Sequence, residues 1–257
     1  MTAGGHEEVR RRLVHARLLG ERFVYRLPGR FPEAAAGPDS SEEPPTVERP
    51  TSGRSSCEAF DAEAWEALRQ EVMTCTRCEL HLTRTQGVFG SGTPLSGFMV
   101  VGEAPGFHED QKGEAFVGAA GQLLTKILAA IGFSRDEVFI TNILKSRPPG
   151  NADPAPHQVS ACIPYLERQI ELIGPAVILT LGRHAARTLL GVDGSMASLR
   201  GRVFEYRGVP VVATYHPAAL LRNPKLKRPT WEDVQLARRV HDEGAAVMGS
   251  PGSATDG

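Results

Sequence analysis

The sequence predicts an α/β protein in which helices cover both faces of a mostly parallel central sheet, a three-layer α/β/α architecture. Short, continuous apolar runs such as Phe98–Gly102 (FMVVG) and Ala176–Leu181 (AVILTL) are typical of strands that are buried on both faces. Segments with helical spacing of apolar residues alternate with these runs, as the crossover connections of a parallel sheet require.

The order of the elements follows from these two patterns. The expected strands are Phe98–Gly102, Val138–Ile143, Ala176–Leu181, Val203–Tyr206 and Val209–Thr214, of which the last two form either a hairpin or two separate sheet strands. The expected helices are Ala64–Met73, Gly121–Ile131, Gln158–Ile173, His184–Leu190 and Trp231–Ala246.

One folded domain is expected over residues 59–246. The segment Pro32–Ser56 is rich in Pro, Glu, Ser and Gly and has few residues to bury, a composition typical of a disordered linker. We therefore expect residues 1–58 to be a disordered or loosely structured N-terminal extension. Residues 247–257, which include GSPGSATDG, are expected to be a flexible tail.

Composition limits the classes of function. The chain has 257 residues, 41% of them hydrophobic, and a formal net charge of −1. Its apolar runs are far shorter than the roughly 18 residues of a membrane span, and the N-terminus lacks the pattern of a secretory signal. We expect a cytoplasmic protein with no membrane partner. Any affinity for nucleic acid must come from a local basic patch, because the net charge provides no general attraction.

Polar residues follow the predicted strands at the points where they end. Glu103 follows the first strand, Asn142 ends the second, His184 lies just after the third, and His216 follows the last. Because parallel strands end at one edge of a sheet, these side chains are expected around a single crevice.

The loop after the first strand does not suit a phosphate. GEAPG at Gly102–Gly106 is neither a dinucleotide-binding glycine motif nor a P-loop, and its Glu and Pro stand where free backbone N–H groups are needed. A flat ligand with amide groups fits better, since Asn142 offers both a donor and an acceptor and Phe116 offers a stacking face. A nucleobase has these features.

Three motifs occur in one order: GEAPGFHEDQKGEAFVG, TNILKSRPP and YHPAALLRNP, with a CxxC before them. In this arrangement the chain resembles the family 4 uracil-DNA glycosylases, the iron–sulfur branch of their superfamily, from about Thr74 to about Gly244. The resemblance implies the fold of that superfamily and the removal of uracil from single- or double-stranded DNA, which begins base-excision repair. The alternative hypothesis is a module that binds deaminated or damaged DNA without cutting it.

The resemblance also implies roles for residues of the crevice. Phe116 would stack on the uracil, Asn142 would read its edge, and His216 would bond to uracil O2. The backbone of the first motif, at Gly102, Ala104 and Gly106, would line the base pocket. Cytosine presents an inverted pattern of donors and acceptors to an amide that matches uracil, so Asn142 would also provide specificity.

A DNA-binding segment follows the last motif. An extruded nucleotide leaves a gap in the duplex that an apolar side chain can fill. The resemblance assigns this wedge to Leu220, and Leu221 also fits. A dense basic cluster follows at once, and it is expected to grip phosphates: Arg222, Lys225, Lys227 and Arg228.

The group that activates water is less clearly marked. In the best-known branch of the superfamily an aspartate in the first motif does this, and Ala104 stands at that position. Glu103 and Glu109 are the candidates for the role. Otherwise the cation-like sugar captures water with little help.

The four cysteines are Cys57, Cys75, Cys78 and Cys162. A CxxC in a cytoplasmic chain indicates metal or redox chemistry rather than a disulfide. In the family four cysteines bind a [4Fe–4S] cluster, and three positions match Cys75, Cys78 and Cys162, whereas the remaining position is Ser146. The fourth ligand would be Ser146, through its oxygen, or Cys57; otherwise the cluster is unstable or absent. The cluster is expected to be structural and separate from the strand-end residues, in a protein that acts as a monomer.

Overall fold

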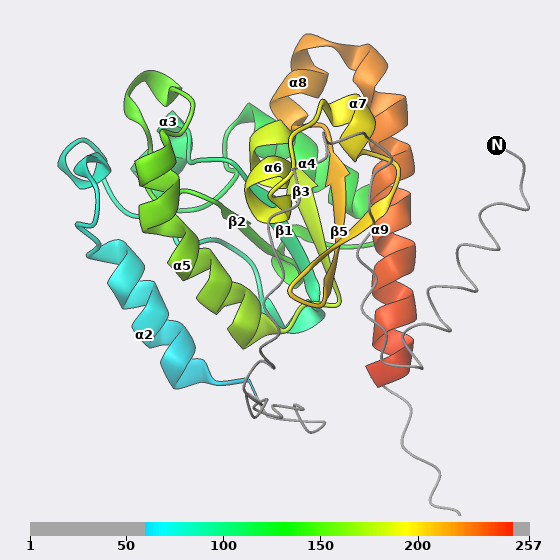
Figure 1. Cartoon of the computed structure of the whole chain (residues 1–257), viewed down its shortest axis with the longest axis horizontal. Helices are drawn as coiled ribbons and strands as arrows, with labels where there is room; N and C mark the ends of the chain where they lie inside the picture. The colour runs from blue at the N-terminus through cyan, green and yellow to red at the C-terminus, as the bar shows by residue number, and fades with distance from the viewer. Residues whose placement is uncertain (1–59, 249–257) are drawn as a thin grey trace, which may run out of the picture. The chain divides into compact units, whose positions relative to one another are not determined.

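The computed structural model describes residues 60–248, and the predictions for the extension 1–58, for Cys57 and for residues 249–257 lie outside them. A five-stranded sheet in the order β2-β1-β3-β5-β4 forms the centre of the described part (Figure 1). Its strands are β1 (Phe98–Gly102), β2 (Phe139–Asn142), β3 (Val177–Leu181), β4 (Val203–Tyr206) and β5 (Val209–Thr214).

The sheet is mostly parallel, as predicted. Strand β1 pairs in parallel with β2 and β3, and β3 pairs in parallel with β5. Strand β4 is antiparallel to β5, so the last two strands form a hairpin at the edge of the sheet. The turn contains Arg207 and Gly208, both with positive φ (50° and 84°), the conformation that matches the twist of a two-residue hairpin.

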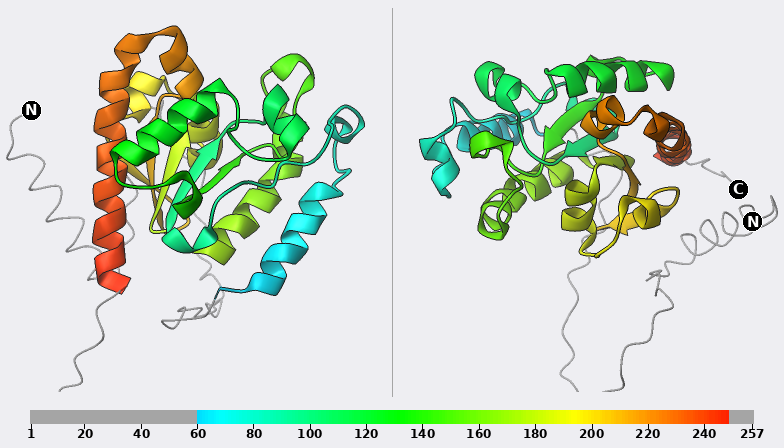
Figure 2. Two further views of the ribbon diagram at one scale, coloured as in Figure 1. Left: turned by 180° about the vertical axis from the view of Figure 1, so that it is seen from behind. Right: turned by 90° about the horizontal axis from the view of Figure 1, so that it is seen from above.

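Two apolar layers cover the sheet because its strands point alternate side chains to opposite faces. Phe98 and Val100 of β1 belong to the cluster that packs against α4 (Ala119–Ala130) and α9 (Lys227–Met248). Met99 and Val101 belong to the cluster on the other face, which packs against α2 (Ala62–Met73), α5 (Pro156–Ile173) and α6 (Arg183–Leu190). Figure 2 shows the helices on the two sides of the sheet, which confirms the three-layer prediction.

Three short helices were not predicted: α3 (Phe107–Lys112), α7 (Met196–Leu199) and α8 (Pro217–Arg222). Each is about one or two turns long, too short for the apolar period to show in the sequence. Helix α9 begins at Lys227, earlier than expected, and continues to Met248, so residues 247 and 248 of the predicted tail are helical.

Helices α3, α6 and α8 each follow a strand and lie at the same end of the sheet, in the upper part of Figure 1. Within residues 60–248, no helix combines the length and the apolar character that crossing a membrane requires.

Candidate active site

The carboxyl ends of the strands bring the predicted base-binding residues together. Gly102 of β1 lies beside Asn142 of β2 in the parallel register. A Cβ on Gly102 would lie 2.4 Å from Oδ1 of Asn142 and 2.5 Å from Cζ of Phe116, so only glycine allows these two side chains to approach the end of β1. The rings of Phe116 and His216 lie 5.5 Å apart at 33°. Asn142 and Phe116 therefore both lie against Gly102 at the end of β1, and His216 lies on the other side of Phe116 as its neighbour.

The side chain of Asn142 is buried and has an unpaired acceptor atom. Its side chain is 2% exposed. Its Oδ1 atom has no hydrogen-bond partner among the described residues. Buried acceptors are nearly always paired in folded proteins, and an unpaired one is costly. The orphan oxygen marks a position where a donor on a bound molecule would be stabilised.

Phe116 is fixed in an uncommon backbone conformation, with a φ of 55°. Arg135 holds this turn: its guanidinium donates to the carbonyl of Phe116 at 2.9 Å, to Ser91 Oγ at 3.1 Å and to the carbonyl of Ala115. A side chain held in this way offers a pre-positioned stacking surface. The sequence carried no local signal for Arg135, which reaches the turn from a separate segment.

His216 is a neutral donor. Burial, first, and the nearby charge of Arg222 lower the pKa of His216 to about 4, while Glu109 opposes the shift. Its Nδ1 atom accepts a hydrogen bond from the N–H of Ala218 at 3.1 Å. The proton of the neutral ring therefore lies on Nε2. Gly182, at the end of β3, permits this packing, because a Cβ there would lie 3.1 Å from that of His216.

Glu109 requires a correction, because its carboxylate is occupied by backbone groups. Oε2 accepts from the N–H of Gly106 at 3.1 Å, and Oε1 accepts from the N–H groups of Val117 and Gly118, each at 2.8 Å. These bonds join the start of the first motif, at Gly106, to its end beside Phe116. Glu109 is a structural link, and the prediction that it is free to activate water is wrong.

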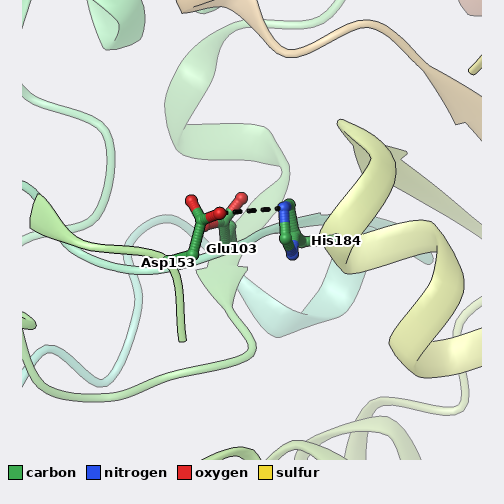
Figure 3. A group of neighbouring side chains, drawn as sticks. All are labelled: Glu103, Asp153 and His184. Atoms are coloured by element: carbon green, nitrogen blue, oxygen red, sulfur yellow. Dashed lines mark ion pairs between the residues drawn. The ribbon is translucent and has the colours of Figure 1, made fainter. Parts of the chain in front are cut away.

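Glu103 stands in a different environment, beside Asp153 and His184 (Figure 3), and these three side chains form a group that could hold a metal ion. One ligand atom of each lies within 4.8 Å of the others, and His184 Nε2 is 3.7 Å from Asp153 Oδ2. Burial raises the pKa of Glu103, and the charges of His184 and Arg183 partly oppose this. A carboxylate with a raised pKa beside an imidazole is suited to accept a proton. The sequence placed His184 at this edge but did not indicate Asp153, which comes from the loop before α5.

The wedge prediction also requires a correction. Leu220 is 2% exposed and packs inside the protein, whereas Leu221 is 51% exposed. Successive residues of a helix point about 100° apart, so α8 can present only one of the two leucines to solvent. Of the two, Leu221 is the side chain that α8 exposes to solvent.

The basic cluster is exposed as predicted, and its four members are Arg222, Lys225, Lys227 and Arg228. They extend from the end of α8 through η5 (Pro224–Leu226) into the first turn of α9. Arg228 makes a long ion pair with Glu232, at 3.8 Å. Figure 1 shows the connection between α8 and α9 at the end of the sheet where α3 and α6 also lie.

The described cysteines gather behind the first motif, and none forms a disulfide. Cys78 and the buried Cys162 share a small apolar cluster with Leu80 and Leu144, against which Ala104 packs. The cysteine site is therefore a neighbour of the strand-end loops, and the prediction that it lies apart from them is wrong. Cys162 lies near the start of α5, soon after the connection that follows β2, and so close to the strand-end loops.

The distances between the cysteine sulfurs can be compared with those that a metal ion requires. Ligand sulfurs of a tetrahedral zinc lie about 3.8 Å apart, since each Zn–S bond is about 2.3 Å long. Within residues 60–248, the three cysteine sulfurs do not form a group closer than 4.8 Å. As they stand, the three sulfurs therefore do not have the spacing of a zinc site.

Ser146, the fourth position of the motif, is buried and linked to the CxxC segment. Its Oγ accepts from Arg84 Nη1 at 2.8 Å, and Nη2 of the same guanidinium donates to the carbonyls of Met73 and Cys75, at 2.8 and 3.0 Å. Arg84 thus joins the serine oxygen to the cysteine segment. A cation at this position stabilises negative charge on that oxygen.

Comparison with known proteins agrees with the geometry. The family model of the uracil DNA glycosylase superfamily matches residues 89–236, which include Phe116, Asn142 and His216. A type-4 uracil-DNA glycosylase of Sulfurisphaera tokodaii is 45% identical over 184 residues, 68% of this chain and 84% of that protein. Those of Archaeoglobus fulgidus and Thermotoga maritima are 46% and 42% identical, over 87% and 94% of their lengths and 64% and 68% of this chain. The chain belongs to the uracil-DNA glycosylase superfamily and, within it, to the type-4 enzymes.

Proposed function

We propose that this protein flips uracil out of DNA and hydrolyses its N-glycosidic bond, leaving an abasic site for base-excision repair. The observation that carries the proposal is the unpaired Oδ1 of Asn142 beside Phe116 and the neutral imidazole of His216. Membership of the family supports the class of reaction, that of a DNA glycosylase. The three side chains named above support the choice of uracil as the base that is removed.

The pocket complements the edge of uracil. The Oδ1 of Asn142 accepts from uracil N3–H, and its amide donates to O4, while Phe116 stacks on the ring. Cytosine has no proton on N3 and carries an amino group in place of O4. It would leave the buried amide unpaired on both counts, which is why a polar pocket of this kind rejects the wrong base strongly.

The departing uracil becomes an anion, and His216 stabilises it. The Nε2–H group donates to O2, where negative charge develops as the bond breaks. A fixed donor of this kind typically contributes about 3 to 4 kcal/mol to the transition state. Because its pKa is about 4, the ring remains a neutral donor throughout the physiological range.

Glu103 is the proposed group that receives the proton of the attacking water. It is the candidate carboxylate of the first motif that remains, because Glu109 is bound to three backbone N–H groups. His184 lies close enough to favour its ionised form. The developing cation at the sugar needs only modest activation of the water, so this contribution is expected to be smaller than that of His216.

DNA is held outside the pocket. Leu221 enters the duplex in place of the extruded nucleotide, and the four-residue basic cluster binds the phosphates around it. We propose that both single and double strands are substrates, and that the protein acts as a cytoplasmic monomer.

Cys75, Cys78 and Cys162 are proposed to hold a [4Fe–4S] cluster, with Ser146 or Cys57 as the fourth ligand. The cluster supplies no step of bond cleavage. It would fasten the CxxC segment to α5 and thereby support Ala104 and the first motif, against which this site packs.

Incubation of the purified full-length protein with U:G, U:A and single-stranded uracil oligonucleotides tests the proposal. Strand scission at abasic sites and free uracil are the readouts, and a matched cytosine oligonucleotide is the control. Tight binding without uracil release from any substrate would favour the alternative, a module that recognises damaged DNA without cutting it.

A further inference from the structure

Arg135 binds two separate segments of the chain at once. It begins η3 (Arg135–Glu137), the short helix before β2, and its side chain is half-buried. One guanidinium nitrogen, Nη1, donates to the carbonyl of Phe116 at 2.9 Å. The other, Nη2, donates to the carbonyl of Ala115 and to Ser91 Oγ. The arginine therefore joins the turn that carries the stacking ring to the loop that precedes β1.

Ser91 continues this connection to β2. Its hydroxyl accepts from the guanidinium and donates in turn to the carbonyl of Ala115, each at 3.1 Å. Its backbone forms a bridge with Ile140: the N–H of Ser91 donates to the carbonyl of Ile140 at 2.9 Å, and the N–H of Ile140 donates back at 2.8 Å. Ile140 lies two residues before Asn142 in the same strand. The Phe116 turn is thus fixed to the strand that carries Asn142.

The residues on either side of Ser91 explain its close approach to β2. Gly90 and Gly92 both have positive φ, 148° and 87°, which residues with a side chain rarely adopt. A Cβ on Gly90 would lie 2.9 Å from the carbonyl oxygen of Ile140, and one on Gly92 would overlap the carbonyl of Val138. The Gly-Ser-Gly segment therefore allows the backbone of Ser91 to pair with the strand.

The arrangement of acceptors requires an arginine. A guanidinium is planar and directs its N–H donors along fixed lines, whereas a lysine carries its donors on one atom. At Arg135 two nitrogens bind two successive carbonyls, and one of them also binds a hydroxyl from another segment. A lysine would keep the charge and lose this fork. The geometry of the donors, and not the charge, is what holds the segments together.

We propose that Arg135 is a positioning residue that sets the spacing between Phe116, which stacks on the uracil, and Asn142, which binds its edge. Both of these side chains lie close to Gly102, so a small movement of the Phe116 turn changes the distance between them. A base held by both is aligned for cleavage only while this distance is fixed. The inference rests on the proposed function and adds the residue that keeps its two base contacts in register.

Arg135→Met and Arg135→Lys are the central variants, because the first removes all donors and the second keeps the charge. Arg238→Met is the matched control: Arg238 also donates to a backbone carbonyl, that of Ile131 at 2.9 Å, and lies over an aromatic ring, that of Phe133 at 4.4 Å. Thermal unfolding is measured, together with kcat and KM on a single-stranded uracil oligonucleotide.

Both Arg135 variants should lose about tenfold to a hundredfold in kcat, with KM changed by less than about threefold, because the DNA is held by other residues. Arg238→Met should keep the kcat of the wild type even where its melting temperature falls. Wild-type kcat in a folded Arg135→Met or Arg135→Lys would overturn the proposal.

A double-mutant cycle tests whether Arg135 acts through the stacking ring. In the Phe116→Ala protein, Arg135→Met should cost less than about threefold in kcat, because the ring that it positions is already absent. The full loss seen in the wild-type background, repeated in the Phe116→Ala protein, would overturn the positioning role.

Ser91→Ala covers the case in which neither Arg135 variant folds. This change removes the hydroxyl between the guanidinium and the Ala115 carbonyl and leaves the backbone bridge to Ile140 in place. We expect kcat to fall by about threefold to tenfold with little change in KM. A folded Ser91→Ala protein with the kcat of the wild type would overturn the connection from the turn to β2.

One measurement is independent of the reaction. If the wild type releases no uracil, the proposed function fails, and NMR of the protein without DNA then decides the positioning role. The nuclear Overhauser contact between the Phe116 ring and the Cα protons of Gly102 should be present in the wild type and in Arg238→Met, and it should be lost in Arg135→Met. Its retention in Arg135→Met would overturn the proposal.

Discussion

The Nδ1 atom of His216 accepts a hydrogen bond from the backbone N–H of Ala218, at 3.1 Å, and this contact determines which ring nitrogen carries the proton. We expect nitrogen NMR at pH 6 to show a neutral ring protonated on Nε2, with a titration midpoint near 4. His216→Ala should lose about a hundredfold or more in kcat while it still binds DNA. A ring that is charged at pH 6 would contradict the neutral-donor assignment.

The same shift affects stability. The folded pKa of His216, about 4, lies below the value of about 6.5 expected in the unfolded chain. The unfolded chain therefore binds the proton first, so stability from the neutral ring is present above about pH 6.5 and is lost as the pH falls toward 4. His216→Asn should show a weaker dependence of the melting temperature on pH in this window.

Glu103 and Glu109 should respond differently to the same substitution. Glu103→Gln is expected to lower kcat by about tenfold, less than the loss in His216→Ala, with little change in melting temperature. Burial raises the pKa of Glu103, so the acid limb in the plot of wild-type kcat against pH should lie above the ordinary pKa range of glutamate. This limb should disappear in the Glu103→Gln variant. Glu109→Gln should instead lower the melting temperature, since an amide has one acceptor oxygen where the carboxylate has two. A fully active Glu103→Gln would show that the sugar captures water without a base.

The two adjacent leucines of α8 form a matched pair. Leu221→Ala should slow uracil release from duplex DNA more than from single strands, with unchanged stability, because its side chain is exposed. Leu220→Ala should lower the free energy of unfolding by about 2–5 kcal/mol, the usual cost of a cavity. The reverse pattern, measured by chemical denaturation and by kinetics on both substrates, would restore Leu220 as the wedge.

The basic cluster should appear in the salt dependence of binding. Replacing Lys225 and Lys227 by glutamine is expected to weaken binding to all sequences and to reduce the slope of log K against log salt by about 0.9 per lost phosphate contact on duplex DNA. Exposed Lys112 and Lys126, replaced in the same way, are the control. An unaltered slope in the Lys225 and Lys227 variant would place the DNA on another surface.

The fourth ligand can be identified by iron content. Ser146→Cys should retain iron and sulfide longer in air than the wild type, because thiolate is the better-matched ligand. Loss of iron in Ser146→Ala would identify the oxygen ligand that Arg84 supports, and loss in Cys57→Ala would identify the thiol. If the wild type contains no iron after anaerobic preparation, the cluster proposal is wrong.

Much of this protein could be predicted from its sequence because the signals are local or periodic. Continuous apolar runs and helical spacing predicted the parallel sheet and its two covering layers. The polar residues at strand ends predicted one pocket, since the carboxyl ends of parallel strands must meet. Three ordered motifs predicted the family. Strand character, helical period and the order of the motifs all depend on residues that are close together in the sequence.

The tertiary structure alone decided which of those residues are free to act. The carboxylate of Glu109 accepts hydrogen bonds from three backbone N–H groups. Leu220 is buried, whereas Leu221 is exposed. In both cases packing, and not residue type, determines what the side chain contacts. Arg135 reaches Phe116, and Arg84 reaches Ser146, from segments far away in the chain. Lys145 looked like one more basic residue in a motif, and only the fold brought its buried ammonium to the carbonyl of Asn142. Contacts of this kind depend on where distant segments meet in space, and no local pattern records that.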